Sequence, residues 1–86
     1  MTTLLLINPN TTEAITDLML REARRFADHR TVLAAATGSF GGRYVSDRAT
    51  YAIAGHAALD AYARHGQNAD AVVLALERRV FPAHQA

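Results

Sequence analysis

The fold is decided near the start of the chain, by residues 4–12, which read LLLINPNTT. The first four are a continuous apolar run, which is typical of a strand buried on both faces of a parallel sheet. Asn8, Pro9 and Asn10 end this run, because asparagine and proline favour turns. Asn10 and Glu13 have the spacing of a helix-capping pair, so the segment predicts a strand, a turn and a helix.

The same alternation continues along the chain. Apolar residues at helical spacing predict a helix over 11–27, and an apolar run with a β-branched start predicts a second strand over 31–36. Ser46, followed by Asp47, is a suitable N-cap for a helix that ends near His65. Residues 71–76, AVVLAL, predict a third strand. The βαβαβ order indicates an α/β fold with a three-stranded parallel sheet in the order 2-1-3, a partial flavodoxin-like lobe.

Composition limits the class of protein. The 86 residues suffice for one small domain, and half of them are apolar while the net charge is only +1, which excludes an intrinsically disordered chain. The arginines are scattered among carboxylates, so no nucleic-acid partner is predicted. No apolar run approaches the length of a membrane span, and the first residues do not resemble a secretory signal. We therefore expect a cytoplasmic protein with no membrane partner.

Candidate binding residues follow the first strand. Open α/β sheets bind ligands beyond the carboxyl ends of their strands, where the strand order reverses. Asn8, Asn10 and Thr11 lie at that place, and the free N–H groups at a helix start favour a carboxylate. Capping of the helix by Asn10 explains the same residues equally well, and the two roles are compatible.

A glycine-rich loop follows the second strand. Residues 38–42 read GSFGG, and glycine permits unusual backbone angles or the close approach of a ligand. Arg43 could receive a substrate carboxylate, although an exposed arginine in a solvated turn is the simpler interpretation. Tyr44 is a further ligand candidate because it adjoins this loop.

These motifs together resemble the opening of the hydantoin racemases and their aspartate/glutamate racemase relatives. The resemblance is carried by residues 8–12 (NPNTT), by residues 40–46 (FGGRYVS) and by the third strand. It implies an incomplete amino-terminal racemase-like lobe over 1–76 and a non-family tail over 77–86, expected to be disordered. It also implies a cofactor-independent isomerase that acts on a small carboxylate or a hydantoin.

Racemisation beside a carbonyl needs a base on one face of the carbon and an acid on the other. In the family this resemblance points to, two cysteines fill these roles, and Leu76 stands where the first is expected. The 86 residues contain no cysteine. Glu77, beside Arg78 and Arg79, would be a weak, solvated base. We therefore expect a truncated racemase-like protein that is inactive alone.

Other functions fit the sequence in part. The alternative is a non-catalytic interaction module, in which the strand around residues 72–74 has an unpaired edge that another copy or a complementing lobe would cover. A nucleotide-binding half-domain has the right βαβ order but lacks the glycine fingerprint and the P-loop lysine. His56 and Asp60 share a helix face, yet a third ligand at useful spacing is missing, so neither a metal nor another cofactor is predicted.

Overall fold

The structure is a computed structural model, and it describes residues 1–75. Within this range, three strands alternate with two helices, and the strands are parallel. The sheet order is β2-β1-β3, so β1 is the central strand. This confirms the predicted α/β class and the predicted strand order. The elements are β1 (Thr2–Asn8), α1 (Glu13–Arg24), β2 (Thr31–Thr37), α2 (Arg48–His65) and β3 (Ala71–Leu74).

The start of α1 differs from the prediction. Its N-cap is Thr12, and the side-chain oxygen of Asn10 accepts a hydrogen bond from the Thr12 N–H (3.0 Å), ahead of the first helical turn. The predicted Asn10–Glu13 capping pair is therefore wrong, because Asn10 closes the turn before the helix instead. The helix also ends at Arg24, three residues before the predicted end at Ala27.

The start of α2 is shifted by one residue from the prediction. Asp47, not Ser46, is the N-cap, and its carboxylate accepts a hydrogen bond from the Thr50 N–H (2.8 Å). The Thr50 hydroxyl in turn accepts a hydrogen bond from the backbone N–H of Asp47 (3.0 Å), which completes a reciprocal capping box. An aspartate with threonine three residues later satisfies two helix-end donors, which Ser46 alone would not do.

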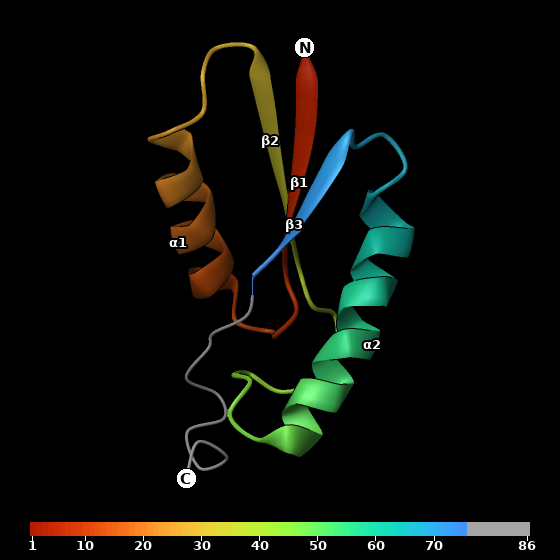
Figure 1. Cartoon of the computed structure of the whole chain (residues 1–86). Coiled ribbons are helices and arrows are strands. Elements are labelled where there is room, and N and C mark those ends of the chain that lie inside the picture. The colour runs from red at the N-terminus through yellow and green to blue at the C-terminus, as the bar shows by residue number, and fades with distance from the viewer. Residues whose placement is uncertain (76–86) are drawn as a thin grey trace, which may run out of the picture.

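The two helices cover opposite sides of the sheet (Figure 1). On the α2 side, Leu5 and Ile7 of β1 form the core with alanines of β2 and α2. Small side chains bring a helix close to a sheet, and α2 presents four buried alanines to it: Ala54, Ala57, Ala58 and Ala61. Burial of Leu5 and Ile7 is nearly complete, with 1% and 2% of their surface exposed. The core is therefore centred on β1.

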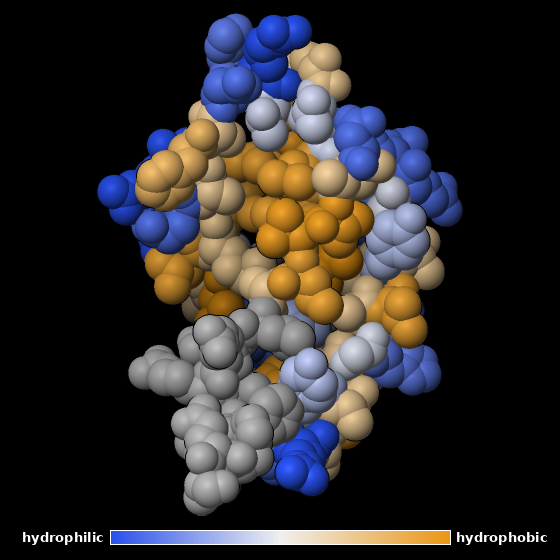
Figure 2. All heavy atoms as spheres, in the orientation of Figure 1, coloured by the Kyte–Doolittle hydropathy of each residue, from blue (hydrophilic) through white to orange (hydrophobic). Residues whose placement is uncertain are grey.

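The third strand lies at the edge of the sheet and is exposed. Val72, Val73 and Leu74 leave 39–46% of their surface open, although their sequence is as apolar as that of β1. Figure 2 shows the result as an apolar area in the middle of the face viewed, over β3 and between the two helices. The exposed edge that the order 2-1-3 implies is thus present in the described part of the chain.

The helices also bear on the question of membrane insertion. The longer one, α2, has 18 residues, but Arg48, Asp60 and Arg64 interrupt its apolar character. Within residues 1–75, no helix combines the length and hydropathy that crossing a bilayer requires.

Candidate functional site

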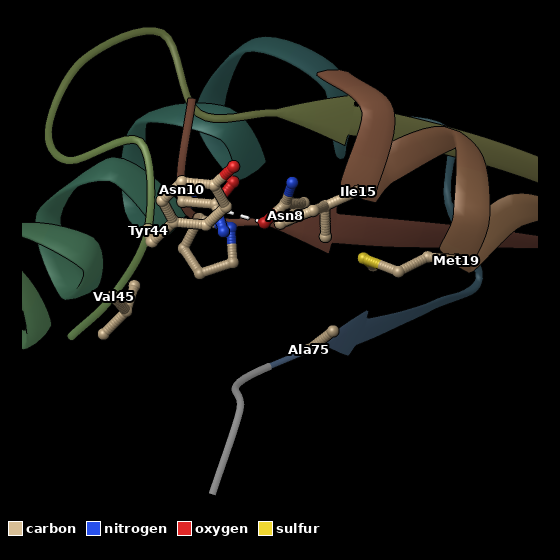
Figure 3. A pocket seen from close by; sticks show the side chains of 8 residues that line it. Asn8, Asn10, Ile15, Met19, Tyr44, Val45 and Ala75 are labelled. Carbon is tan, nitrogen blue, oxygen red and sulfur yellow. Dashed lines mark hydrogen bonds between the residues drawn. The ribbon is translucent and has the colours of Figure 1, made fainter. Parts of the chain in front are cut away.

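A pocket of about 310 Å³ opens at the carboxyl ends of β1 and β3, where the order 2-1-3 predicts a ligand crevice. Its wall comes from four places in the chain: the turn after β1, the first turns of α1, the loop before α2 and the end of β3 (Figure 3). The lining residues are Asn8, Pro9, Asn10, Ile15, Met19, Tyr44, Val45 and Ala75.

Asn8 forms the base of this site and is 1% exposed. Its amide nitrogen donates to the carbonyl of Thr12 (3.1 Å) and to the hydroxyl of Thr16 (3.0 Å). Its amide oxygen accepts from the backbone N–H of Asn10 (3.2 Å), as the dashed line in Figure 3 marks. Both amide hydrogens therefore have internal acceptors. Asn8 fixes the geometry of the turn rather than offering a free donor to a ligand.

The Asn8 contacts extend into a buried polar chain beneath the pocket. The hydroxyls of Thr16 and Thr37 lie 2.6 Å apart, so the network joins β1, α1 and β2. In the described residues, every fully buried side-chain nitrogen or oxygen has a hydrogen-bond partner. Satisfied polar networks hold a site rigid, because any movement leaves a buried group unpaired.

Asn10 differs from Asn8 in having a donor to spare. It is 8% exposed, and its side-chain oxygen accepts from Thr12. Among residues 1–75, its amide nitrogen has no hydrogen-bond partner. Since no fully buried side-chain polar atom in this range is unpaired, that nitrogen is reached by solvent, and the residue lines the pocket. Asn10 can therefore donate to a carbonyl or carboxylate oxygen in the pocket without losing an existing bond.

The glycine-rich loop is fastened over the start of α1. The backbone N–H of Thr11 donates to the carbonyl of Gly42 (3.0 Å), and the Thr12 hydroxyl donates to the carbonyl of Arg43. Gly41 has a φ of 106°, which side-chain-bearing residues rarely adopt. These contacts hold the next two residues, Tyr44 and Val45, against the pocket. The loop therefore forms a fixed wall.

The pocket contains three of the five predicted binding residues: Asn8, Asn10 and Tyr44. Thr11 and Arg43 are not among its lining residues. Thr11 instead bonds to Gly42 through both its N–H and its hydroxyl, and Arg43 contributes its backbone carbonyl to Thr12. Leu76, the position expected to hold the first cysteine, lies outside the described residues, as does the predicted tail 77–86.

Of the eight described residues that line the pocket, sequence reasoning did not single out four, and all four are apolar. Ile15 and Met19 fall within the helix predicted over 11–27, and Val45 and Ala75 are not among the predicted binding residues. One signal for these two residues of the helix was available in the sequence. Ile15 and Met19 are four residues apart on the helix that directly follows β1, the strand at which the strand order reverses. Residues at that spacing share a face, and in this fold the face borders the crevice.

The pair His56 and Asp60 fastens α2 to the loop that leaves β2. The His56 ring packs edge-on against Phe40, with ring centres 5.4 Å apart. Asp60 accepts hydrogen bonds from the Ser39 hydroxyl (2.9 Å) and from Arg64 (3.0 Å). These two bonds, that from Ser39 first, hold the pKa of the Asp60 carboxyl below its ordinary value. In the described part of the chain, no group of three or more potential ligands could hold a metal ion.

Comparison of the chain with protein-family models, with curated proteins and with solved structures gave no match. The racemase resemblance therefore remains a prediction. The Asn-Pro-Asn turn and the glycine-rich loop were identified separately in the sequence. They meet at one pocket through contacts between residues 11–12 and 42–43.

Proposed function

We propose that the chain is a cytoplasmic, cofactor-independent lobe of the aspartate/glutamate/hydantoin racemase kind, and that it binds a small carboxylate or hydantoin. The observation that supports this most is the amide donor of Asn10, which has no hydrogen-bond partner within residues 1–75 and lies in a pocket where the strand order reverses. Both ligand types present oxygen acceptors to such a donor. Tyr44 lines the same pocket and offers a second polar side chain for recognition.

We propose further that these residues bind without racemising. The sequence contains no cysteine, so neither the base nor the acid of a thiol pair is among its 86 residues. We expect no incorporation of solvent deuterium at the substrate α-carbon above a control without protein. The variant Leu76→Cys should not restore turnover, because the acid on the opposite face would still be missing. Measurable exchange by either chain contradicts this part of the proposal.

Binding is tested by a substitution that changes only the donor. Asn10→Asp keeps the oxygen that accepts from Thr12 but replaces the amide NH₂ with an oxygen. The affinity for a hydantoin or carboxylate, measured by NMR titration, should fall about tenfold or more, since a lost hydrogen bond is combined with an unfavourable charge. Asn68→Asp makes the same change at an exposed turn between α2 and β3 and should leave the affinity unchanged. Equal effects of the two variants would contradict the assignment.

The exposed strand β3 favours a second candidate, a non-catalytic module completed by another copy or by a separate lobe. Three apolar residues that are 39–46% exposed on an edge strand provide both a hydrogen-bonding edge and an apolar surface for a partner. Light scattering after size exclusion separates the candidates. A monomer at all concentrations that binds hydantoin supports the first, and a stable oligomer without ligand binding supports the second.

A further inference from the structure

The side of α2 that faces away from the sheet is uncharged and exposed (Figure 1). The buried alanines of this helix face the sheet, and Ala57, in the middle of that row, is 0% exposed. The opposite side, here called the outer face of α2, consists of six exposed residues: Tyr51, Ala52, Gly55, Leu59, Tyr62 and Ala63. Leu59 alone is 70% exposed. A surface helix normally carries charged residues on its outer face, so this pattern is typical of a helix that is covered on both sides.

The outer face of α2 is complementary in shape to a second copy of itself. A two-fold axis beside position 57 relates two antiparallel copies, and residues at equal distances from that position then meet. The resulting pairs are Tyr51 with Ala63, Ala52 with Tyr62, and Gly55 with Leu59. Every large side chain in this arrangement lies opposite a small one, which lets two helices pack closely. A Cβ at Gly55 would meet nothing within 4 Å, so there is open space there for Leu59 of the other copy.

The charge at the start of α2 fits the same antiparallel arrangement. Arg48 is exposed and stands four residues before Ala52, so it extends the outer face. The first turn of the helix contains no acidic residue, and a cation at this end opposes the helix dipole. In the antiparallel pair, Arg48 lies beside the carboxyl end of the other helix, where the last carbonyl groups are partially negative. A charge that is unfavourable within one copy is therefore favourable between two.

We propose that the outer face of α2 is the contact surface of a homodimer, in which the two copies of this helix pack antiparallel. The inference is independent of the proposed ligand binding, because none of the six residues lines the pocket. It also assigns self-association to α2 and not to the edge of β3. One helix face is smaller than the standard interface of about 800 Å² per partner, so the dissociation constant should be on the order of 10⁻⁵ M.

Analytical ultracentrifugation of the whole chain tests the dimer between about 1 µM and 1 mM. The unmodified chain should change from monomer to dimer within this range. Leu59→Glu places a carboxylate against Gly55 of the other copy and should raise the dissociation constant by about a hundredfold or more. Leu18→Glu makes the same change on α1, where the side chain is 49% exposed, and should leave the constant unchanged. A chain that stays monomeric throughout, or a dimer that Leu59→Glu does not weaken, overturns the proposal.

Reversal of the charge at Arg48 tests the antiparallel orientation. Arg48→Glu should raise the thermal stability of the dilute monomer, because an acidic residue at a helix start is favourable. The same variant should weaken the dimer by about tenfold, since its carboxylate would face the partially negative end of the other helix. A parallel pair would instead bring the two Arg48 side chains together, and removal of that repulsion would tighten the dimer. An unchanged or tighter dimer in Arg48→Glu contradicts the antiparallel arrangement.

Discussion

β1 and β3 are similar in sequence and opposite in environment. Residues 4–7 of β1 are LLLI and residues 71–74 of β3 are AVVL, both continuous apolar runs. Leu5 is 1% exposed, while Leu74 is 46% exposed. The difference comes from strand order, because β1 has a paired strand on each side and β3 has only β1 beside it in the described part of the chain. An apolar run therefore predicts a strand, but its burial depends on its neighbours.

The same contrast separates the two sides of the pocket. The turn after β1 is held by the side chains of Asn8 and Asn10 and by contacts with the glycine-rich loop. Within residues 1–75, the end of β3 contributes only Ala75. One wall is thus fixed before any ligand arrives, which favours binding because little order has to be imposed on it. The other wall is joined to the most exposed strand.

Truncation of core side chains should give the largest difference between the strands. Leu5→Ala should lower the free energy of unfolding by about 2–5 kcal/mol, comparable with the whole stability of about 3–5 kcal/mol expected for so small a domain. Leu74→Ala should lower it by less than about 1 kcal/mol, because nearly half of that side chain is already in water. Urea denaturation of dilute protein, followed by circular dichroism, measures both. Similar losses would show that β3 is buried in solution.

Hydrogen exchange should show the same contrast without substitution. We expect the amides of Leu4–Ile7 to exchange only when the whole domain unfolds, and those of Val72–Leu74 to exchange faster by about a hundredfold or more. Dilution provides the control, because self-association through β3 would protect its amides at high concentration only. Equal and strong protection of both strands in a proven monomer would contradict the edge position of β3.

The same substitution, glycine to alanine, tests a position where a new Cβ would be crowded and a position where it would have open space. A Cβ at Gly38 would lie 2.7 Å from the carbonyl oxygen of Pro9 and 2.9 Å from that of Asn10, so Gly38→Ala should destabilise the protein by about 1–3 kcal/mol. A Cβ at Gly55, within α2, would meet nothing within 4 Å. Gly55→Ala should therefore stabilise the protein by about 0.5–1 kcal/mol. Thermal unfolding measures both, and a stabilising Gly38→Ala would contradict the close contact with the turn.

The sequence was sufficient for the elements and their order, and insufficient for the details of the site. Apolar runs and helical spacing predicted all five elements, because these patterns depend on local geometry. The capping prediction for Asn10 failed because its side-chain oxygen accepts from the Thr12 N–H in the turn rather than from the Glu13 N–H in the helix, and the sequence spacing does not decide between these two donors. The apolar wall was missed because Ile15 and Met19 look like ordinary core residues until β3 is placed beside them.

The smallest effect that we expect is a pH dependence of the folding stability, caused by Asp60 on the side of the sheet that α2 covers. Asp60 joins α2 to the loop after β2, and its pKa is lowered mainly by the Ser39 hydroxyl and then by Arg64. A carboxyl whose pKa is lower in the folded state stabilises the fold above its unfolded pKa of 3.8, and this contribution is lost as the pH falls through the folded value. The fold should therefore lose a little stability in acid.

Two variants identify Asp60 as the source of that loss. Asp60→Asn should be slightly less stable than the unmodified chain at neutral pH, and the two should converge below the folded pKa, where Asp60 is protonated. Ser39→Ala removes the hydrogen bond that lowers this pKa most, so the pKa of Asp60 measured by NMR should move up toward its ordinary value while Arg64 still holds it below that value. The effect is small because the carboxylate is exposed to solvent, which screens its interactions. An unchanged Asp60 titration in Ser39→Ala would mean that the bond from Ser39 does not persist in solution, and that α2 is held to the loop after β2 by the contact of His56 with Phe40 instead.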